Sequence, residues 1–115
     1  MPSREFYFDQ IEKECASARE AVNTGNDGKV RVCARRVVSH AVTWFLTKNP
    51  EKQWRPDAIG QLQSLAQDTF FPQDIRDAAV RLSMRVTEQF KYSSPTDPLA
   101  DAQRIITYIE QLVGS

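Results

Sequence analysis

Residues 27–49, DGKVRVCARRVVSHAVTWFLTKN, form the longest uninterrupted periodic segment of the chain. Apolar side chains recur in it at spacings of three and four, the period of an amphipathic helix with a broad buried face. The stripe consists of Val30, Ala34, Val37, Ala41 and Trp44, widened by Cys33, Val38 and Phe45. Asn26 precedes the segment as a capping residue, and Pro50 ends it because proline disfavours helical geometry in its predecessor. The segment therefore predicts a long central helix.

Four further segments show the same period and predict the remaining helices. They cover about residues 3–23, 57–67, 72–91 and 98–113. The expected buried stripe of the first consists of Phe8, Ile11, Cys15, Ala18 and Val22. The short turn between the first two helices makes them an antiparallel pair. No linker is long enough to separate two domains, and connections of two to eight residues are typical of helical bundles. We predict one all-α domain over residues 1–115, an up-and-down bundle of five helices.

Composition narrows the range of functions. Fifteen basic residues balance fifteen acidic ones, whereas a dedicated duplex-DNA binder usually has a net basic footprint. No segment approaches the ~18 apolar residues of a membrane span, and the N-terminus lacks the apolar core of a signal peptide. We expect a cytoplasmic protein without a membrane partner, with Cys15 and Cys33 as buried thiols. The sequence shows no metal-ligand spacing and no glycine-rich phosphate loop, so neither a metal nor a cofactor is predicted.

His40, the only histidine, is the candidate catalytic residue. Arg36 lies four residues before it and shares its helix face, whereas Arg35 lies five before it, about 140° around the helix. In a ribonuclease, His40 could take the proton of a ribose 2′-hydroxyl while Arg35 or Arg36 stabilises charge on the phosphate. The alternative is a histidine at the border of a packed helix with an arginine nearby.

A basic face on the central helix is the candidate nucleic-acid interface. It consists of Lys29, Arg31, Arg35 and Arg36. These side chains could contact phosphates, or they could form a solvated face that Asp27 and Glu20 neutralise. A second line, Arg81 and Arg85 with Asp77, is expected to be a ladder of surface salt bridges.

The aromatic residues are open to two interpretations. They are Trp44, Phe45, Phe70, Phe71 and Phe90. They could form a pocket for a base or an apolar ligand, or the core of a small bundle. Phe70 and Phe71 are expected to anchor the turn that follows the third helix. Trp54, in the polar loop NPEKQWRP, is expected to fold back onto the bundle.

The layout of these helices resembles the HEPN superfamily of helical bundles associated with prokaryotic nucleotide-binding proteins. AREAVNTGNDGKVRVCARRVVSHAV is similar to the family's opening hairpin, DAIGQLQSLA to its short middle helix, and FKYSSPTDPLADAQRIITYI to its last loop and helix. Many members carry an R-x4–6-H motif that cleaves RNA without a metal, and Arg35 and His40 match R-x4-H. The family's motif usually lies later in the bundle, and its arginine is typically followed by asparagine, aspartate or histidine rather than by a residue such as Arg36.

The resemblance implies three possible functions. Since many HEPN proteins lack the motif and act as binding or partner modules, the first is a non-catalytic homodimer that associates with RNA, a nucleotide or a protein partner. The second is a metal-independent endoribonuclease with His40 as the base and Arg35 or Arg36 as the phosphate ligand. The third is a purely structural dimerisation bundle.

Overall fold

The computed structural model describes residues 4–83 and 98–113. Over these residues the chain forms five α-helices and no strand: α1 (Arg4–Asn23), α2 (Asp27–Lys48), α3 (Ala58–Gln67), α4 (Gln73–Ser83) and α5 (Pro98–Val113). This confirms the predicted all-α fold, and the predicted helix ends that fall on described residues lie within one residue of the observed ones. The expected continuation of the fourth helix over residues 84–91, with Phe90, lies outside the described residues.

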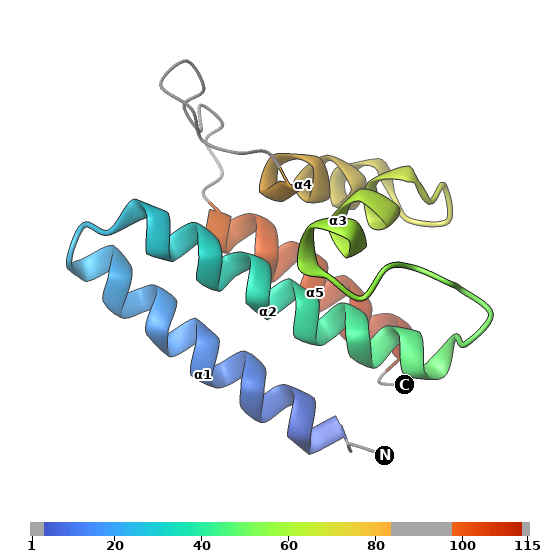
Figure 1. Ribbon diagram of the computed structural model, residues 1–115, viewed down its shortest axis with the longest axis horizontal. Coiled ribbons are helices and arrows are strands. Elements are labelled where there is room, and N and C mark those ends of the chain that lie inside the picture. Colours follow the sequence, from blue (N-terminus) through green and yellow to red (C-terminus); the bar gives the residue numbers. More distant parts are fainter. Residues whose placement is uncertain (1–3, 84–97, 114–115) are drawn as a thin grey trace.

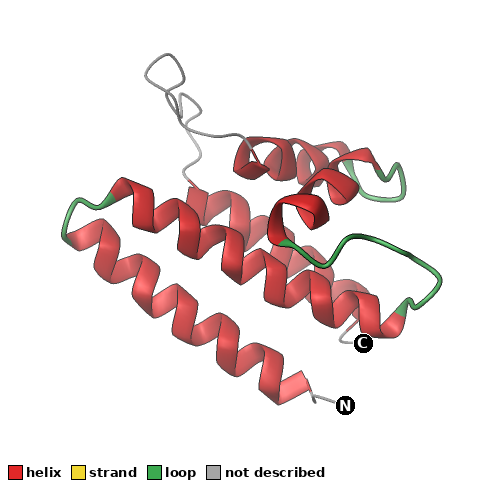
Figure 2. Cartoon of the chain, in the orientation of Figure 1, coloured by secondary structure: helices red, strands yellow, loops and turns green. Residues whose placement is uncertain are grey.

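The central helix is α2, which packs against each of the other four helices. Figure 1 shows α1 antiparallel to α2, and α4 antiparallel to α5, while α5 runs beside α2 in the same direction. The short pair α3–α4 lies over one side of α2 and α5, and a longer loop joins α2 to α3 (Figure 2). This arrangement encloses α2 more completely than a helix at the edge of a bundle.

Burial along α2 follows the predicted stripe. All eight apolar residues named for this stripe are buried. The side chain of Asn26 accepts a hydrogen bond of 3.1 Å from the backbone N–H of Lys29, which satisfies one of the free donors at the start of a helix. Gly25 supplies the left-handed conformation of the preceding turn, with φ of 72°. The predicted start of the central helix is therefore confirmed together with its physical cause.

The buried face of α1 differs from the predicted one. The expected stripe was Phe8, Ile11, Cys15, Ala18 and Val22, whereas the buried residues are Tyr7, Ile11, Ala18 and Ala21. Phe8 and Cys15 are only partly buried, and Val22 is 53% exposed. Two stripes of similar apolar content lie next to each other on this helix, and α2 covers the one centred on Tyr7 and Ala21.

A hydrogen-bonded amide joins α2 to α3. Gln61 is almost fully buried on α3. Its Oε1 accepts a hydrogen bond of 2.7 Å from the hydroxyl of Ser39, and its Nε2 donates one of 3.1 Å to the hydroxyl of Thr43. Because the two hydroxyls are four residues apart on α2, they lie on one face and bracket the same amide. A buried amide left unpaired would be costly, so this network fixes how α3 sits on α2.

An ion pair joins α4 to α5. Arg81 donates hydrogen bonds of 2.9 and 2.7 Å to the two carboxylate oxygens of Asp101, which is completely buried. We predicted a surface ladder of Arg81 and Arg85 with Asp77. The pairing of Arg81 with Asp77 is wrong, since Asp77 accepts a hydrogen bond from Gln73, and Arg85 lies outside the described residues. The sequence stripe on α4 could not identify this partner, since Asp101 lies twenty residues further along the chain.

The aromatic residues divide between core and surface. Trp44, Phe45 and Phe71 are buried. Trp54 folds back as predicted, with its ring centroid 5.9 Å from that of Phe45 and 6.1 Å from that of Phe71. Phe70, in contrast, is 60% exposed. The prediction that both phenylalanines anchor the turn is thus confirmed for Phe71 and wrong for Phe70.

Candidate functional site

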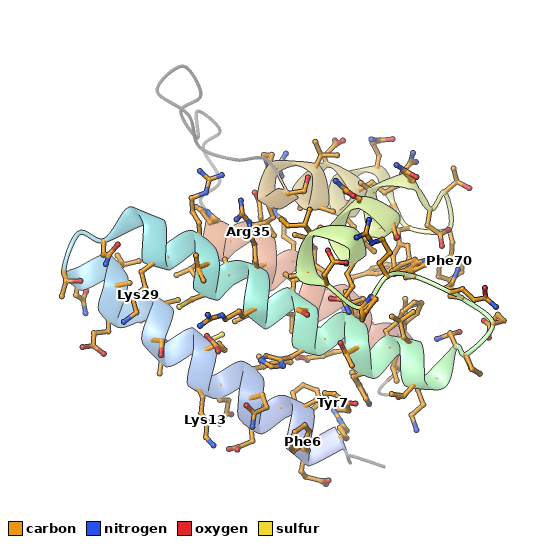
Figure 3. The ribbon with its side chains drawn as sticks, in the orientation of Figure 1. Phe6, Tyr7, Lys13, Lys29, Arg35 and Phe70 are labelled. Carbon is orange, nitrogen blue, oxygen red and sulfur yellow. The ribbon has the colours of Figure 1, made fainter. Side chains whose placement is uncertain are left out.

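Arg35 lies on the side of α2 that faces α4 (Figure 3). Its Nε donates a hydrogen bond of 2.7 Å to the backbone carbonyl of Leu82 on α4. The side chain is half-buried. A hydrogen bond from a charged guanidinium is stronger than one between neutral groups. Arg35 therefore has a structural role in joining α4 to α2.

His40 and Arg36 lie on the side of α2 that faces α1. His40 is half-buried and Arg36 is exposed. Burial lowers the pKa of His40 below its ordinary value, the charge of Glu14 on α1 raises this pKa, and that of Arg36 lowers it. The net direction is downward, so the imidazole is neutral at pH 7. The structure thus groups His40 with Arg36 and Glu14, while Arg35 is engaged on the other side of the helix.

The predicted basic face is divided between two sides of α2. Lys29 points toward α1, whereas Arg35 lies on the side of α4 (Figure 3). Arg31 is only 8% exposed, and its burial lowers the pKa of its guanidinium. Lys29 and Arg36 are the exposed members of the set. The four cations therefore do not present one continuous surface to a phosphate backbone.

Both cysteines are free thiols, and Glu14 acts on each of them. Cys33 is buried, and burial is the main cause that raises its pKa. Burial also raises the pKa of Cys15, which lines a cavity of about 160 Å³ between α1, α2 and α5 together with Arg19. Thiols with raised pKa values are poor nucleophiles at neutral pH, because the thiolate is the reactive form.

A larger hollow opens where the C-terminal ends of α2 and α5 meet the turn after α3. Its volume is about 500 Å³, within the usual range of small-molecule sites. The residues that line it are Phe45, Lys48, Asn49, Glu51, Lys52, Phe70, Leu112 and Val113. Polar and apolar side chains are present in equal number, which is unlike a plain defect in the core. This hollow is the second candidate site, after the group of His40, Arg36 and Glu14.

Phe70 stands at this hollow on a well-held turn. Its backbone N–H donates a hydrogen bond of 3.0 Å to Oδ1 of Asp68, and its ring meets that of Phe71 edge-on, with centroids 5.4 Å apart. Asp68 is itself held by Lys52, whose ammonium lies 2.7 Å from Oδ2 and 5.6 Å from the ring centre of Trp54. The pKa of Asp68 is lowered, chiefly by the hydrogen bond from Lys52. The turn that carries the exposed ring is therefore held in place.

Two absences are relevant to the chemistry of the described residues. Within 4–83 and 98–113, no three side chains of the His, Cys, Asp or Glu type are grouped so as to hold a metal ion. In the same ranges no helix combines the length and the apolar character that crossing a membrane requires.

Comparison with known proteins finds no match: no family model, no curated protein and no solved structure is similar to this chain.

Helical periodicity and motif spacing do not indicate Glu14, Lys48 or Lys52 as site residues. Only the packing of α1 on α2 brings Glu14 near His40. The two lysines flank Asn49 and Pro50, where the central helix ends. The sequence signal for the hollow is an aromatic pair in a turn, Phe70 and Phe71, together with a loop that contains lysine. The turn and the loop come together only in the fold, because they lie about twenty residues apart in the chain.

Proposed function

We propose that this chain is a HEPN-like helical module of the cytoplasm that forms a homodimer and binds RNA or a nucleotide without cleaving it. The resemblance in helix layout supports the family, and the mixed hollow at the ends of α2 and α5 supports binding. The observation that carries the proposal is that the exposed Phe70 and the exposed Lys48 line the same hollow. Aromatic faces and ammonium groups are the side chains that hold bases and phosphates in sites of low sequence preference.

The engagement of Arg35 supports a non-catalytic role. If Arg35 and His40 formed a catalytic R-x4-H motif, the guanidinium of Arg35 would have to approach the phosphate next to His40. Its Nε instead binds the Leu82 carbonyl, and it lies about 140° around the helix from His40. Release of Arg35 would leave that carbonyl without this hydrogen bond, which makes the rearrangement costly.

Binding is tested by fluorescence anisotropy with a labelled single-stranded RNA of mixed sequence at several salt concentrations. We expect an affinity that falls with salt, since displaced counterions accompany each phosphate contact. With one or two lysines at the site, the slope of log K against log salt is expected to be shallow, about −0.7 per phosphate contact. A protein that binds neither this RNA nor nucleoside monophosphates at low salt contradicts the proposal.

The endoribonuclease remains the second candidate, because Arg36 and a neutral His40 share one side of α2. Incubation of the RNA with the wild type and with His40→Ala, both in EDTA, separates the two functions. We predict that neither protein cleaves it. Cleavage by the wild type that disappears in His40→Ala would establish the enzyme instead, and Arg36→Ala would then be compared with Arg35→Ala.

A further inference from the structure

The hollow at the ends of α2 and α5 has a definite ligand chemistry. We propose that it is a stacking site for one unpaired base of single-stranded RNA, with Phe70 against the base and Lys48 at the adjoining phosphate. This inference rests on the proposed function and specifies its site and substrate class. It also places RNA binding at the last turn of α2, away from the cations in the first half of this helix, Lys29, Arg31, Arg35 and Arg36.

Phe70 offers an exposed aromatic face at this hollow. Phe70 is 60% exposed, although the adjacent Phe71 is buried in the aromatic core. The turn that carries it is tied by the hydrogen bond from its N–H to Asp68 and by the Asp68–Lys52 ion pair. Because the backbone of this turn is already ordered, a ligand that covers the ring has less conformational entropy to remove. Base–aromatic stacking uses this kind of platform, and it tolerates any base because every base has a π-face.

The charged side chains at the rim of the hollow favour a ligand with one anionic group. Lys48 is exposed in the last turn of α2, and no ion pair to it is formed by residues 4–83 and 98–113. Lys52 is partly neutralised by Asp68, and Glu51 is an opposing charge on the same rim. A single phosphate therefore fits at Lys48, whereas a run of phosphates along the rim would meet Glu51. The ligand that matches is an aromatic ring bearing one nearby anion.

A stacking site at this hollow is expected to bind single strands in preference to duplexes. The two faces of a base inside a duplex are already covered by its neighbours, so a protein ring cannot stack on it without unstacking the helix. A volume of about 500 Å³ suits one nucleotide unit rather than a duplex end with both strands. The site is thus expected to prefer single-stranded RNA and to distinguish poorly between bases.

The test measures the anisotropy of labelled oligouridylate, alone and annealed to oligoadenylate, with full-length variants. We expect Phe70→Ala to weaken single-strand binding about 5- to 150-fold, the range for loss of one base–aromatic stack, and Phe70→Trp to preserve it. Phe6→Ala is the matched control, because Phe6 is also an exposed ring in edge contact with a buried aromatic, but it lies on α1 (Figure 3). It should leave the affinity unchanged.

A second pair of variants tests the phosphate contact. Lys48→Met should weaken binding and reduce the salt slope by about 0.7, one phosphate contact on a single strand. Lys13→Met, which removes an exposed lysine of α1, should do neither. Circular dichroism shows whether Phe70→Ala folds. If it does not, the comparison of Lys48→Met with Lys13→Met still tests whether RNA binds at the hollow.

The outcomes separate the two proposals. Binding by the wild type that neither Phe70→Ala nor Lys48→Met alters overturns the stacking site and leaves the proposed function standing. Equal affinity for the annealed duplex also overturns it. Absence of binding to any RNA or nucleotide overturns both.

Discussion

At the scale of single residues, Arg81 and Asp101 are the pair most sensitive to mutation. Asp101 is completely buried, whereas the side chain of Arg81 is 28% exposed. Arg81→Met leaves a buried carboxylate without this partner, and we expect the free energy of unfolding to fall by about 3–5 kcal/mol. Asp101→Asn should cost less, because Arg81 can turn toward water and the amide can still accept a hydrogen bond. Urea unfolding of the two variants measures the difference.

The control for this pair is Lys13→Met, which breaks an exposed ion pair between Lys13 and Asp9. Exposed pairs contribute at most about 1 kcal/mol, so this variant should unfold near the wild-type midpoint. If Arg81→Met were as stable as Lys13→Met, Asp101 could not be the buried charge that the structure describes.

His40 gives a prediction about pH. Burial, the largest influence, lowers the pKa of this imidazole below 6.5, with a smaller lowering from Arg36 and a raising from Glu14. In the unfolded chain the group protonates near 6.5, so just below that pH the unfolded state binds more protons than the folded one. The stabilisation from a neutral His40 is therefore complete above about pH 6.5, and it is lost as the pH falls through that value toward the lower folded pKa.

His40→Gln removes this titration. Its free energy of unfolding should be flat over the same interval, down to the pH where carboxylates begin to protonate, near pH 5. Chemical denaturation at closely spaced pH values measures both curves. An identical slope in wild type and variant would show that His40 has the same pKa in both states.

At the scale of helices, Gly60 and Gly28 give opposite predictions for the same substitution. A Cβ at Gly60 would lie 2.8 Å from the Cβ of Arg55 and 2.8 Å from Oδ1 of Asp57, the residue that caps α3. At Gly28 a Cβ would meet only Oδ1 of Asn26, at 3.9 Å. Alanine favours a helix over glycine by up to about 1 kcal/mol. Gly28→Ala should therefore raise the thermal midpoint, whereas Gly60→Ala should lower it by pushing the cap away.

Calorimetry on the two variants decides this prediction. Each serves as the other's control, because the change in helix propensity is the same in kind. A rise in the midpoint of Gly60→Ala would mean that the chain before α3 moves aside at little cost.

At the scale of the whole molecule, self-association is the property to measure. Single apolar side chains remain exposed on α1, α2 and α4, among them Val22, Val32 and Val80. Exposed apolar residues scattered in this way are also normal on monomers, so the proposed homodimer rests on the resemblance in helix layout. We predict a homodimer with twice the chain mass of 13.1 kDa. Sedimentation equilibrium over a range of concentrations tests this, and a mass of one chain throughout would contradict it.

The candidate site was only partly predictable from the sequence. The spacing of Arg36 and His40 placed them on one face of α2, and the electrostatic influence of Arg36 on His40 agrees with that. Glu14 beside His40, and Phe70 at the end of α2, depend on which faces of α1 and of the turn meet α2. Local spacing carries no information about such distant contacts, because it reports only the period of the helix on which it lies.

The helices and the buried face of α2 follow from local properties of the sequence. Helical periodicity, capping by Asn26 and Asp57, and the proline after Asn49 are local effects that operate within a few residues. Tertiary packing determines which of two apolar stripes α1 buries, that Arg81 pairs with Asp101, and that Arg35 binds the Leu82 carbonyl of α4. These outcomes depend on close packing and on the burial of polar groups, which must be paired wherever the fold removes them from water.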